Sequence, residues 1–482
     1  MIKKLWKSGA VKVWFIVSVA VIALFVAITI VASAVPVIYN VFNMVMPGGG
    51  PRAIYAEGID PIYTTEYSDK NAVYAAARDM NREICEEGMV LLKNEGNALP
   101  LATPVSDPSV SERPKISVFG KNSVNIAYGG SGSGGADTSN VIDLYDALEQ
   151  SGYEVNDTLK SFYEDTRVSG PVREGNSSDL DSGDTVILTT AETPQSMYTD
   201  AVKSSYAEYN DMALVVITRI GGEGFDMPRL MTRTDNEGDV TDVTGARAGK
   251  DDHFLQLDQN EADMVKAVCD AGFDRVVIAL NTGQAIETGF IEADSGYAAL
   301  KGYDIDGSKI DAAIWMGFPG ETGTLALGSI LNGSVNPSGK LADTYATDFK
   351  KDPTWENFGD NRITARTIKD DNGNNVHSPG GDEYVFDVTT GSVPRDYYYF
   401  VDYEEGVYVG YKYYETRGAT DGEEWYDANV VYPFGYGLSY TRFTWTLEDA
   451  SGINNVAISG SEKYTVQVRV KNDGDVAGKE VV

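Results

Sequence analysis

Short, largely apolar runs separated by segments of helical spacing constrain the fold of this chain most. Their positions are 116–120, 185–189, 213–217, 275–281 and 312–316. Runs of this length are typical of strands buried on both faces, as in parallel sheets. Residues 259–271 show helical spacing followed by Gly272, which predicts a helix between two such strands. Strands that alternate with helices predict an α/β fold, a doubly wound and mostly parallel sheet sandwich.

Composition excludes several classes of function. The formal net charge of -33 argues against nucleic-acid binding, which needs clustered Lys and Arg, and it suits neutral ligands such as sugars. The two cysteines, Cys85 and Cys269, form neither a disulfide framework nor a metal-ligand spacing. With only His253 and His377, we expect no histidine-based metal site, and no motif indicates a cofactor. A length of 482 residues allows two or three domains.

The N-terminus has the pattern of a membrane anchor. A basic segment, 1–12, precedes an apolar run at 13–34 that is long enough to cross a bilayer as a helix. The lysines lie on its amino side, so the positive-inside rule predicts a single-pass protein of the cell membrane. We expect residues 35–70 to form a linker, with the chain from about Pro47 on outside the cell. A cleaved signal peptide is the alternative, because Ala32-Ser33-Ala34 resembles a cleavage site.

One carboxylate lies in a glycine-rich turn that follows a predicted strand. Glu223 has three glycines around it in the stretch 219–226, directly after the run 213–217. Turns after parallel strands lie at the carboxyl edge of the sheet, where open α/β folds bind ligands. Glu223 is thus either a catalytic or ligand-binding glutamate or part of a solvated acidic loop. These residues alone favour the solvated loop in a chain with 72 acidic residues.

A second glycine-rich loop, 128–135, follows the strand predicted at 116–120. Such a loop between a strand and a helix can hold phosphate. However, no Gly-Lys-Ser/Thr follows, so the P-loop pattern is absent. The spacing does not form a clean dinucleotide-binding fingerprint either. We predict the following helix over 141–148, with Ser139 or Asn140 as its N-cap.

Several segments in order resemble glycoside hydrolase family 3, the β-glucosidase family. They are 88–101 (Gly-Met-Val-Leu-Leu-Lys-Asn to Leu-Pro-Leu), 219–226, 281–283, 320–341 (Gly-Glu to Asn-Pro-Ser-Gly-Lys-Leu), 405–414 and 432–441. The resemblance implies an α/β-sandwich domain over 71–350, whose first helix we predict at 71–92, and an irregular aromatic-rich connecting region over 351–442. The alternating residues of 464–471 predict a strand, and 476–482 would start another. Residues 443–482 therefore resemble a truncated fibronectin-III-like domain.

The resemblance also implies the roles of individual residues. Glu223 matches the general acid/base of the family. Substrate-binding positions would be Gly130, Ser131, Gly132, Ser133, Arg219 and Asp226. The substrate would be a β-linked oligosaccharide or an aryl or alkyl glycoside, with no metal and no cofactor.

The second carboxylate of a retaining glycosidase is not evident in this chain. In family 3 the nucleophile is an aspartate of a Ser-Asp-Trp-type motif in an (α/β)8 barrel, and no Ser-Asp-Trp occurs in the 482 residues. The order of segments resembles circularly permuted members, so we expect this chain to be a fragment and the barrel to follow Val482. It would then be part of a retaining β-glycosidase, inactive alone. The alternatives are a non-catalytic, membrane-anchored carbohydrate-binding protein and, more distantly, a flavodoxin-like nucleotide-binding protein.

Overall fold

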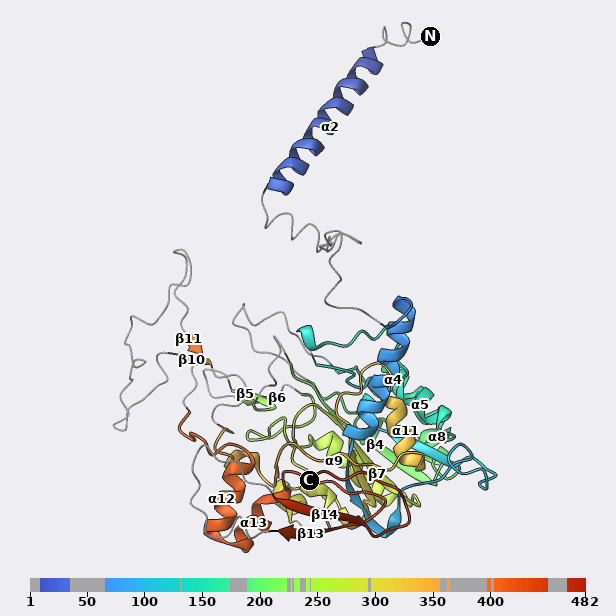
Figure 1. Ribbon diagram of the computed structural model, residues 1–482, viewed down its shortest axis with the longest axis vertical. Coiled ribbons are helices and arrows are strands. Elements are labelled where there is room, and N and C mark those ends of the chain that lie inside the picture. The colour runs from blue at the N-terminus through green and yellow to red at the C-terminus, as the bar shows by residue number, and fades with distance from the viewer. Residues whose placement is uncertain are drawn as a thin grey trace, which may run out of the picture. The chain divides into compact units, whose positions relative to one another are not determined.

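The chain separates into two compact units, Met1–Ala72 and Val73–Val482. The computed structural model describes residues 9–34, 66–130, 132–173, 189–222, 227, 229–234, 240–242, 244–293, 296–355, 362–364, 397–399, 403–449 and 466–482. In the first unit, helix α2 spans Gly9–Ala34 and includes the apolar run 13–34 (Figure 1). Nevertheless, none of the described helices is long and apolar enough to cross a membrane, so the predicted transmembrane segment is not supported.

A six-stranded sheet forms the core of the second unit. Its order is β1-β8-β7-β4-β2-β3. The strands are β1 (Val90–Asn94), β2 (Lys115–Phe119), β3 (Glu154–Val155), β4 (Met212–Arg219), β7 (Val276–Thr282) and β8 (Ala312–Trp315). Five strands are parallel, and β1 joins the edge antiparallel to β8. The predicted α/β fold with a mostly parallel sheet is confirmed; the strand predicted at 185–189 lies almost entirely outside the described residues.

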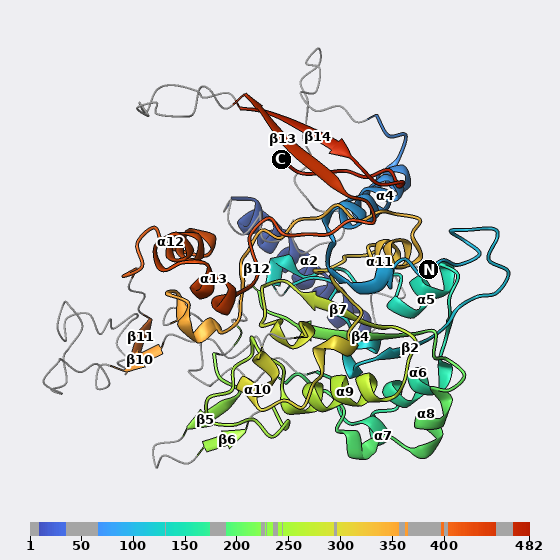
Figure 2. The same cartoon turned by 90° about the horizontal axis from the view of Figure 1, so that it is seen from below.

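Helices cover both faces of this sheet. All eight residues of β4 are buried, and alternate side chains enter opposite cores, as the period of two in a strand requires. Ala213, Val215 and Ile217 pack with α6 (Asp157–Glu164), α8 (Asp200–Ser205) and α9 (Gln259–Asp270). Leu214 and Val216 pack with α5 (Leu144–Gln150) and α11 (Thr324–Asn332). Figure 2 shows the two groups of helices on either side of the strands.

Two predicted helices have different boundaries in the structure. Helix α4 spans Lys70–Gly88, so the helix predicted over 71–92 is too long at its end. Strand pairing with β8 takes the chain from Val90 on into the sheet, a contact that helical spacing does not reveal. Helix α5 begins after Asp143, whose side chain accepts a hydrogen bond from the Asp146 N–H, and not after Ser139 or Asn140.

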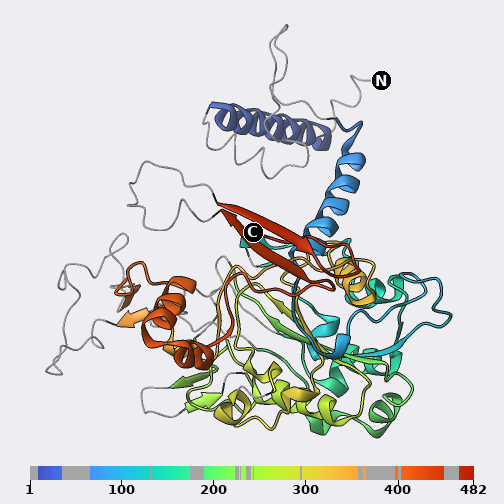
Figure 3. The same ribbon diagram turned by 60° about the horizontal axis from the view of Figure 1, so that its bottom comes forward.

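The C-terminal part adds helices and small ladders. The region predicted as irregular contains α12 (Tyr411–Asp421) and α13 (Glu423–Asn429). Strand β13 (Phe443–Asp449) pairs antiparallel with β14 (Gln467–Asn472), as Figure 3 shows. The strand predicted to start at 476–482 is not observed, and these residues have no partner strand in the described structure. The remaining two-stranded ladders are β9 (Tyr345–Ala346) with β12 (Val430–Tyr432), β5 (Thr232–Thr234) with β6 (Val240–Asp242), and β10 (Arg362–Thr364) with β11 (Tyr397–Tyr399).

Candidate functional site

The carboxyl ends of four parallel strands, β2, β4, β7 and β8, lie at one edge of the sheet. The order of connection reverses between β2 and β4, because β3 lies on one side of β2 and β4 on the other. Such a switch point is where open α/β sheets bind ligands. Gly120 makes the sharp exit from β2 with a φ of 98°, and a Cβ there would lie 2.4 Å from the Val216 carbonyl oxygen. A glycine is therefore required at this turn.

The two glycine-rich loops predicted from the sequence lie against each other at this edge. A Cβ on Gly130 would lie 3.3 Å from the Gly221 carbonyl oxygen and 3.9 Å from the Gly222 Cα. Gly132 and Ser133 belong to a short 3-10 helix, Gly132–Gly134, and Ser133 is exposed. The loop after β2 thus approaches the backbone that immediately precedes Glu223.

Three of the predicted site residues, Ser131, Glu223 and Asp226, lie outside the described residues. Their catalytic and substrate-binding roles stay predictions.

Arg219, at the end of β4, is held entirely by the protein. Its side chain is 1% exposed and forms a two-pronged ion pair with Glu261, with N–O distances of 2.7 and 2.6 Å. The remaining guanidinium donors bind the carbonyl oxygens of Thr218, Phe254 and Gln256. All five N–H groups are used. This arrangement favours a structural role, fixing the strand end four residues before Glu223, over the predicted contact with substrate.

Asn281 is a second organiser of the edge that sequence reasoning did not assign. Its Oδ1 accepts hydrogen bonds from the Ala127 N–H at 2.6 Å and the Thr218 hydroxyl at 3.2 Å. Its Nδ2 donates to the carbonyl oxygens of Ala127, at 2.9 Å, and Gly317, at 2.7 Å. One fully buried amide therefore ties the end of β4 to the segments after β2 and β8. The sequence contained one signal for this role of Asn281, which is its position at the end of a predicted strand in a segment resembling family 3.

Buried carboxyl groups surround the Arg219–Glu261 pair. Burial, together with the negative charge of Glu261, raises the pKa of Asp258 to about 7. Burial also raises the pKa of Glu192 well above its ordinary value, although the backbone N–H of Lys121 donates to that carboxyl group. Asp258 caps α9 in a reciprocal capping box with Glu261. The raised pKa of Asp258 thus links proton binding by this carboxyl group to the packing of α9 behind the end of β4.

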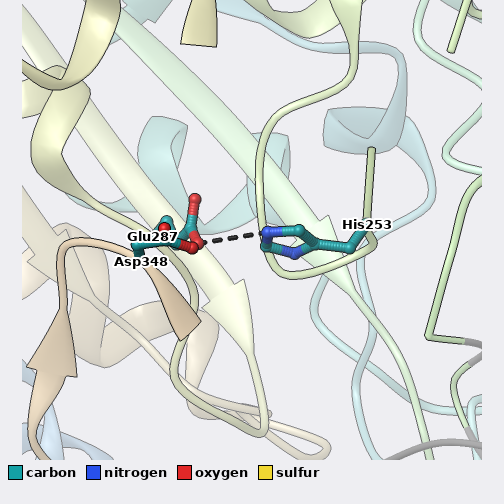
Figure 4. A group of neighbouring side chains, drawn as sticks. All are labelled: His253, Glu287 and Asp348. Atoms are coloured by element: carbon teal, nitrogen blue, oxygen red, sulfur yellow. Dashed lines mark ion pairs between the residues drawn. The ribbon is translucent and has the colours of Figure 1, made fainter. Parts of the chain in front are cut away.

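A cluster of His253, Glu287 and Asp348 lies near the same edge, and sequence reasoning did not find it. Figure 4 shows the imidazole of His253 directed at the two carboxylates. His253 Nε2 lies 3.1 Å from Glu287 Oε1, and both side chains are fully buried. One ligand atom from each residue lies within 4.8 Å of the others, so the three could hold a metal ion.

The partners of Glu287 favour an ion-pair cluster over a metal centre. The Lys301 ammonium lies 2.7 Å from Oε2, which also accepts a hydrogen bond from the Tyr297 hydroxyl. The Phe349 N–H donates to Oε1. Burial alone would raise the pKa of Glu287, but the hydrogen bond from His253 and the charge of Lys301 lower it below its ordinary value. The Lys301 ammonium already balances the charge of the buried carboxylate, so charge balance in this cluster does not require a metal ion.

The fold and this edge define an α/β domain with two neighbouring glycine-rich loops at a topological switch point. Residues 89–440 match the glycosyl hydrolase family 3 C-terminal domain. The chain therefore belongs to glycosyl hydrolase family 3.

Similar proteins include β-glucosidases of bacteria. Beta-glucosidase A of Butyrivibrio fibrisolvens is 30% identical over 418 residues, covering 84% of this chain and 41% of that protein. Thermostable beta-glucosidase B of Acetivibrio thermocellus is 26% identical, covering 86% of this chain and 40% of that protein. The structure of beta-glucosidase 3B from Thermotoga neapolitana in complex with glucose matches with a TM-score of 0.53 at 25% identity, covering 86% of this chain and 44% of that chain. This chain thus spans about two fifths of the length of these curated relatives.

Proposed function

We propose that this chain is part of a retaining β-glycosidase and supplies its general acid/base, Glu223. The observation that carries the proposal is the contact between Gly130 and the backbone at Gly221, inside the region that matches the family domain. It brings the loop to which the resemblance assigns substrate binding next to the segment that leads into Glu223. The match to β-glucosidases supports a β-linked glycoside as the substrate.

In this mechanism Glu223 first protonates the leaving glycosidic oxygen and later removes a proton from the attacking water. The nucleophile is an aspartate of a barrel domain that the 482 residues do not include. The two carboxylates of a retaining enzyme must stand about 5–5.5 Å apart. Contact between the α/β domain and the barrel must therefore place the segment 219–226 against the barrel. The hydrogen bonds of Arg219 hold the start of this segment at the end of β4.

The leaving group of the substrate provides the decisive experiment. In the protein joined to its barrel, Glu223→Ala should reduce hydrolysis of an alkyl β-glucoside by about 10²–10⁴-fold. A substrate with a good phenolate leaving group needs little protonation, so its first step should be spared and a glycosyl-enzyme should accumulate. Glu237→Ala, the same substitution 14 residues further along the chain, is the control and should leave both rates unchanged. Equal losses on both substrates would contradict the assignment.

A non-catalytic carbohydrate-binding protein is the second candidate, favoured by the absence of a Ser-Asp-Trp motif from the sequence. It predicts sugar binding without turnover even when a family 3 barrel is present. Residues 1–482 alone should not hydrolyse β-glucosides under either proposal. Turnover by this chain alone would contradict both.

A further inference from the structure

A pocket lies between the segments of α8 and α9, on one face of the sheet. Its volume is about 580 Å³, within the usual range of about 300–1,000 Å³ for small-molecule sites. Figure 2 shows α8 and α9 on the same side of the strands. The pocket is separate from the candidate site, because none of its described lining residues belongs to the loops 128–135 and 219–226.

Small side chains on the facing segments leave this space unfilled. Ala267 lies on α9 and Ala271 is the C-cap of that helix, while Ala207 follows the end of α8. Ala207 and Ala271 are exposed, so the pocket is open to the surface. A ligand can therefore enter it without a rearrangement of the core.

Three aromatic rings line the pocket. Phe119, the last residue of β2, packs edge-on against Tyr206 and Phe273, at 5.1 and 5.4 Å between ring centroids. The rings of Tyr206 and Phe273 are 5.7 Å apart, and both side chains are half-buried, so part of each ring remains accessible. Aromatic rings associate edge-to-face or in offset stacks. The wall therefore favours a ligand with a planar ring.

The charge of the lining is unusual for so acidic a chain. Among the described residues that line the pocket, Lys203 alone carries a formal charge, and its ammonium forms no ion pair within the described part of the chain. The carboxylates next to the lining residues are already paired, Glu208 with Lys115 at 2.8 Å and Asp270 with Lys309 at 2.6 Å. The pocket therefore favours an anion, although the net charge of the chain is -33.

Uncharged polar groups indicate how many hydrogen bonds a ligand can form. The Tyr206 hydroxyl and the Asn210 side-chain amide form no hydrogen bond within the described structure, and neither group is enclosed by protein atoms. Both can donate to one carboxylate. The lining residues of α9, Met264, Ala267 and Val268, are apolar. The several hydroxyl groups of a sugar would lose water there without gaining partners.

We propose that this pocket binds an aromatic monocarboxylate, with its ring against the three aromatic side chains and its carboxylate beside Lys203. The site goes beyond the proposed glycosidase function, because it requires neither Glu223 nor a barrel domain.

The test is a titration of residues 1–482 with phenylpropanoate at pH 7, followed by saturation-transfer NMR. We expect a dissociation constant on the order of 1 mM for a ligand of this size. Phenylpropanol has the same ring without the charge and should bind about two- to fivefold more weakly, since the Lys203 ammonium is exposed to solvent. Phenylpropylamine, a cation, should bind more weakly still. Hexanoate has the carboxylate without the ring and should bind about tenfold more weakly than phenylpropanoate.

Two variants test the charge and the space separately. Lys203→Met should weaken phenylpropanoate about two- to fivefold and leave phenylpropanol unchanged. Its control is Lys412→Met, an exposed lysine of α12 outside the pocket. Ala267→Phe should fill the pocket and weaken both ligands by about tenfold or more. Its control is Ala299→Phe, at an exposed alanine of α10 (Tyr297–Lys301).

The exposed position of Lys203 keeps the test decisive if Ala267→Phe does not fold, because Lys203→Met should leave the melting temperature unchanged. No binding of phenylpropanoate by the wild type, or equal affinity in the Lys203 and Lys412 variants, would overturn the proposal. Unchanged binding in a folded Ala267→Phe variant would place the ligand elsewhere and overturn it as well. Tighter binding of phenylpropylamine, hexanoate or glucose than of phenylpropanoate would refute the proposed class of ligand.

Discussion

Removal of one charge from the buried Arg219–Glu261 pair is expected to destabilise the α/β domain strongly. The two side chains are 1% exposed, and Glu261 accepts two of the five guanidinium hydrogen bonds. In Glu261→Gln the guanidinium keeps its charge in the interior without a counter-charge. Breaking such a pair costs about 3–5 kcal/mol, because the remaining charge is neither solvated nor paired. With a urea m-value of about 3 kcal/mol/M, the midpoint should fall by about 1–2 M.

Equilibrium urea unfolding followed by far-ultraviolet circular dichroism measures this effect. Glu208→Gln is the control, since Glu208 pairs with Lys115 at 2.8 Å on the surface, where solvent screens the pair, and its midpoint should not move measurably. The double variant Arg219→Met/Glu261→Leu removes both charges and should recover part of the lost stability.

Two results would refute this reasoning. A midpoint shift for Glu261→Gln no larger than that for Glu208→Gln would show that the pair is not a desolvated one. A double variant less stable than Glu261→Gln would show that the three carbonyl contacts of Arg219, rather than the unpaired charge, determine the loss.

Three further predictions follow from burial and location. The pKa of Asp258 in the folded state, about 7, lies above its ordinary value of 3.8, so the unfolded chain loses its proton first and stability falls as pH rises from about 4 to 7. Asp258→Asn should therefore gain stability relative to the wild type between pH 5 and pH 8, measured by urea unfolding; parallel pH dependences would exclude Asp258 as the cause. Amide hydrogen exchange should be fast over 443–482, where β13 and β14 pair only with each other among the described strands, and slow in β4; equal protection would show that other contacts support this two-stranded ladder. If residues from about Pro47 on are extracellular, protease added to intact cells should remove the α/β domain, and full protection would disprove that location.

The strands of the sheet were predictable because their signal is local. A run such as 213–217 indicates burial on both faces by itself, and the structure has β4 fully buried there. Pairing is not local. Val90–Asn94 forms the antiparallel edge with a strand more than 200 residues away. Helical spacing alone did not reveal this pairing, so the predicted helix extended to residue 92 although α4 ends at Gly88. The N-cap at Asp143 likewise depended on where α5 packs.

The candidate site was predictable to the extent that sheet geometry determines it. Carboxyl ends of parallel strands meet at one edge, and the loops at Gly130 and Gly221 do lie together there. The partners of Arg219 were not predictable, because Glu261 is 42 residues further on and nothing in either segment marks the pair.

Fixed residues on both sides of Glu223 would allow the α/β domain to present the proposed acid/base to a second domain. Arg219 is locked by five hydrogen bonds, and Met227 is buried, with its sulfur 3.7 Å from Gln284 Nε2 just beyond β7. Seven intervening residues are thus attached at both ends to the same rigid sheet. Catalytic groups need positions accurate to about 0.5 Å, which supporting contacts must provide when the substrate's other contacts come from a separate domain.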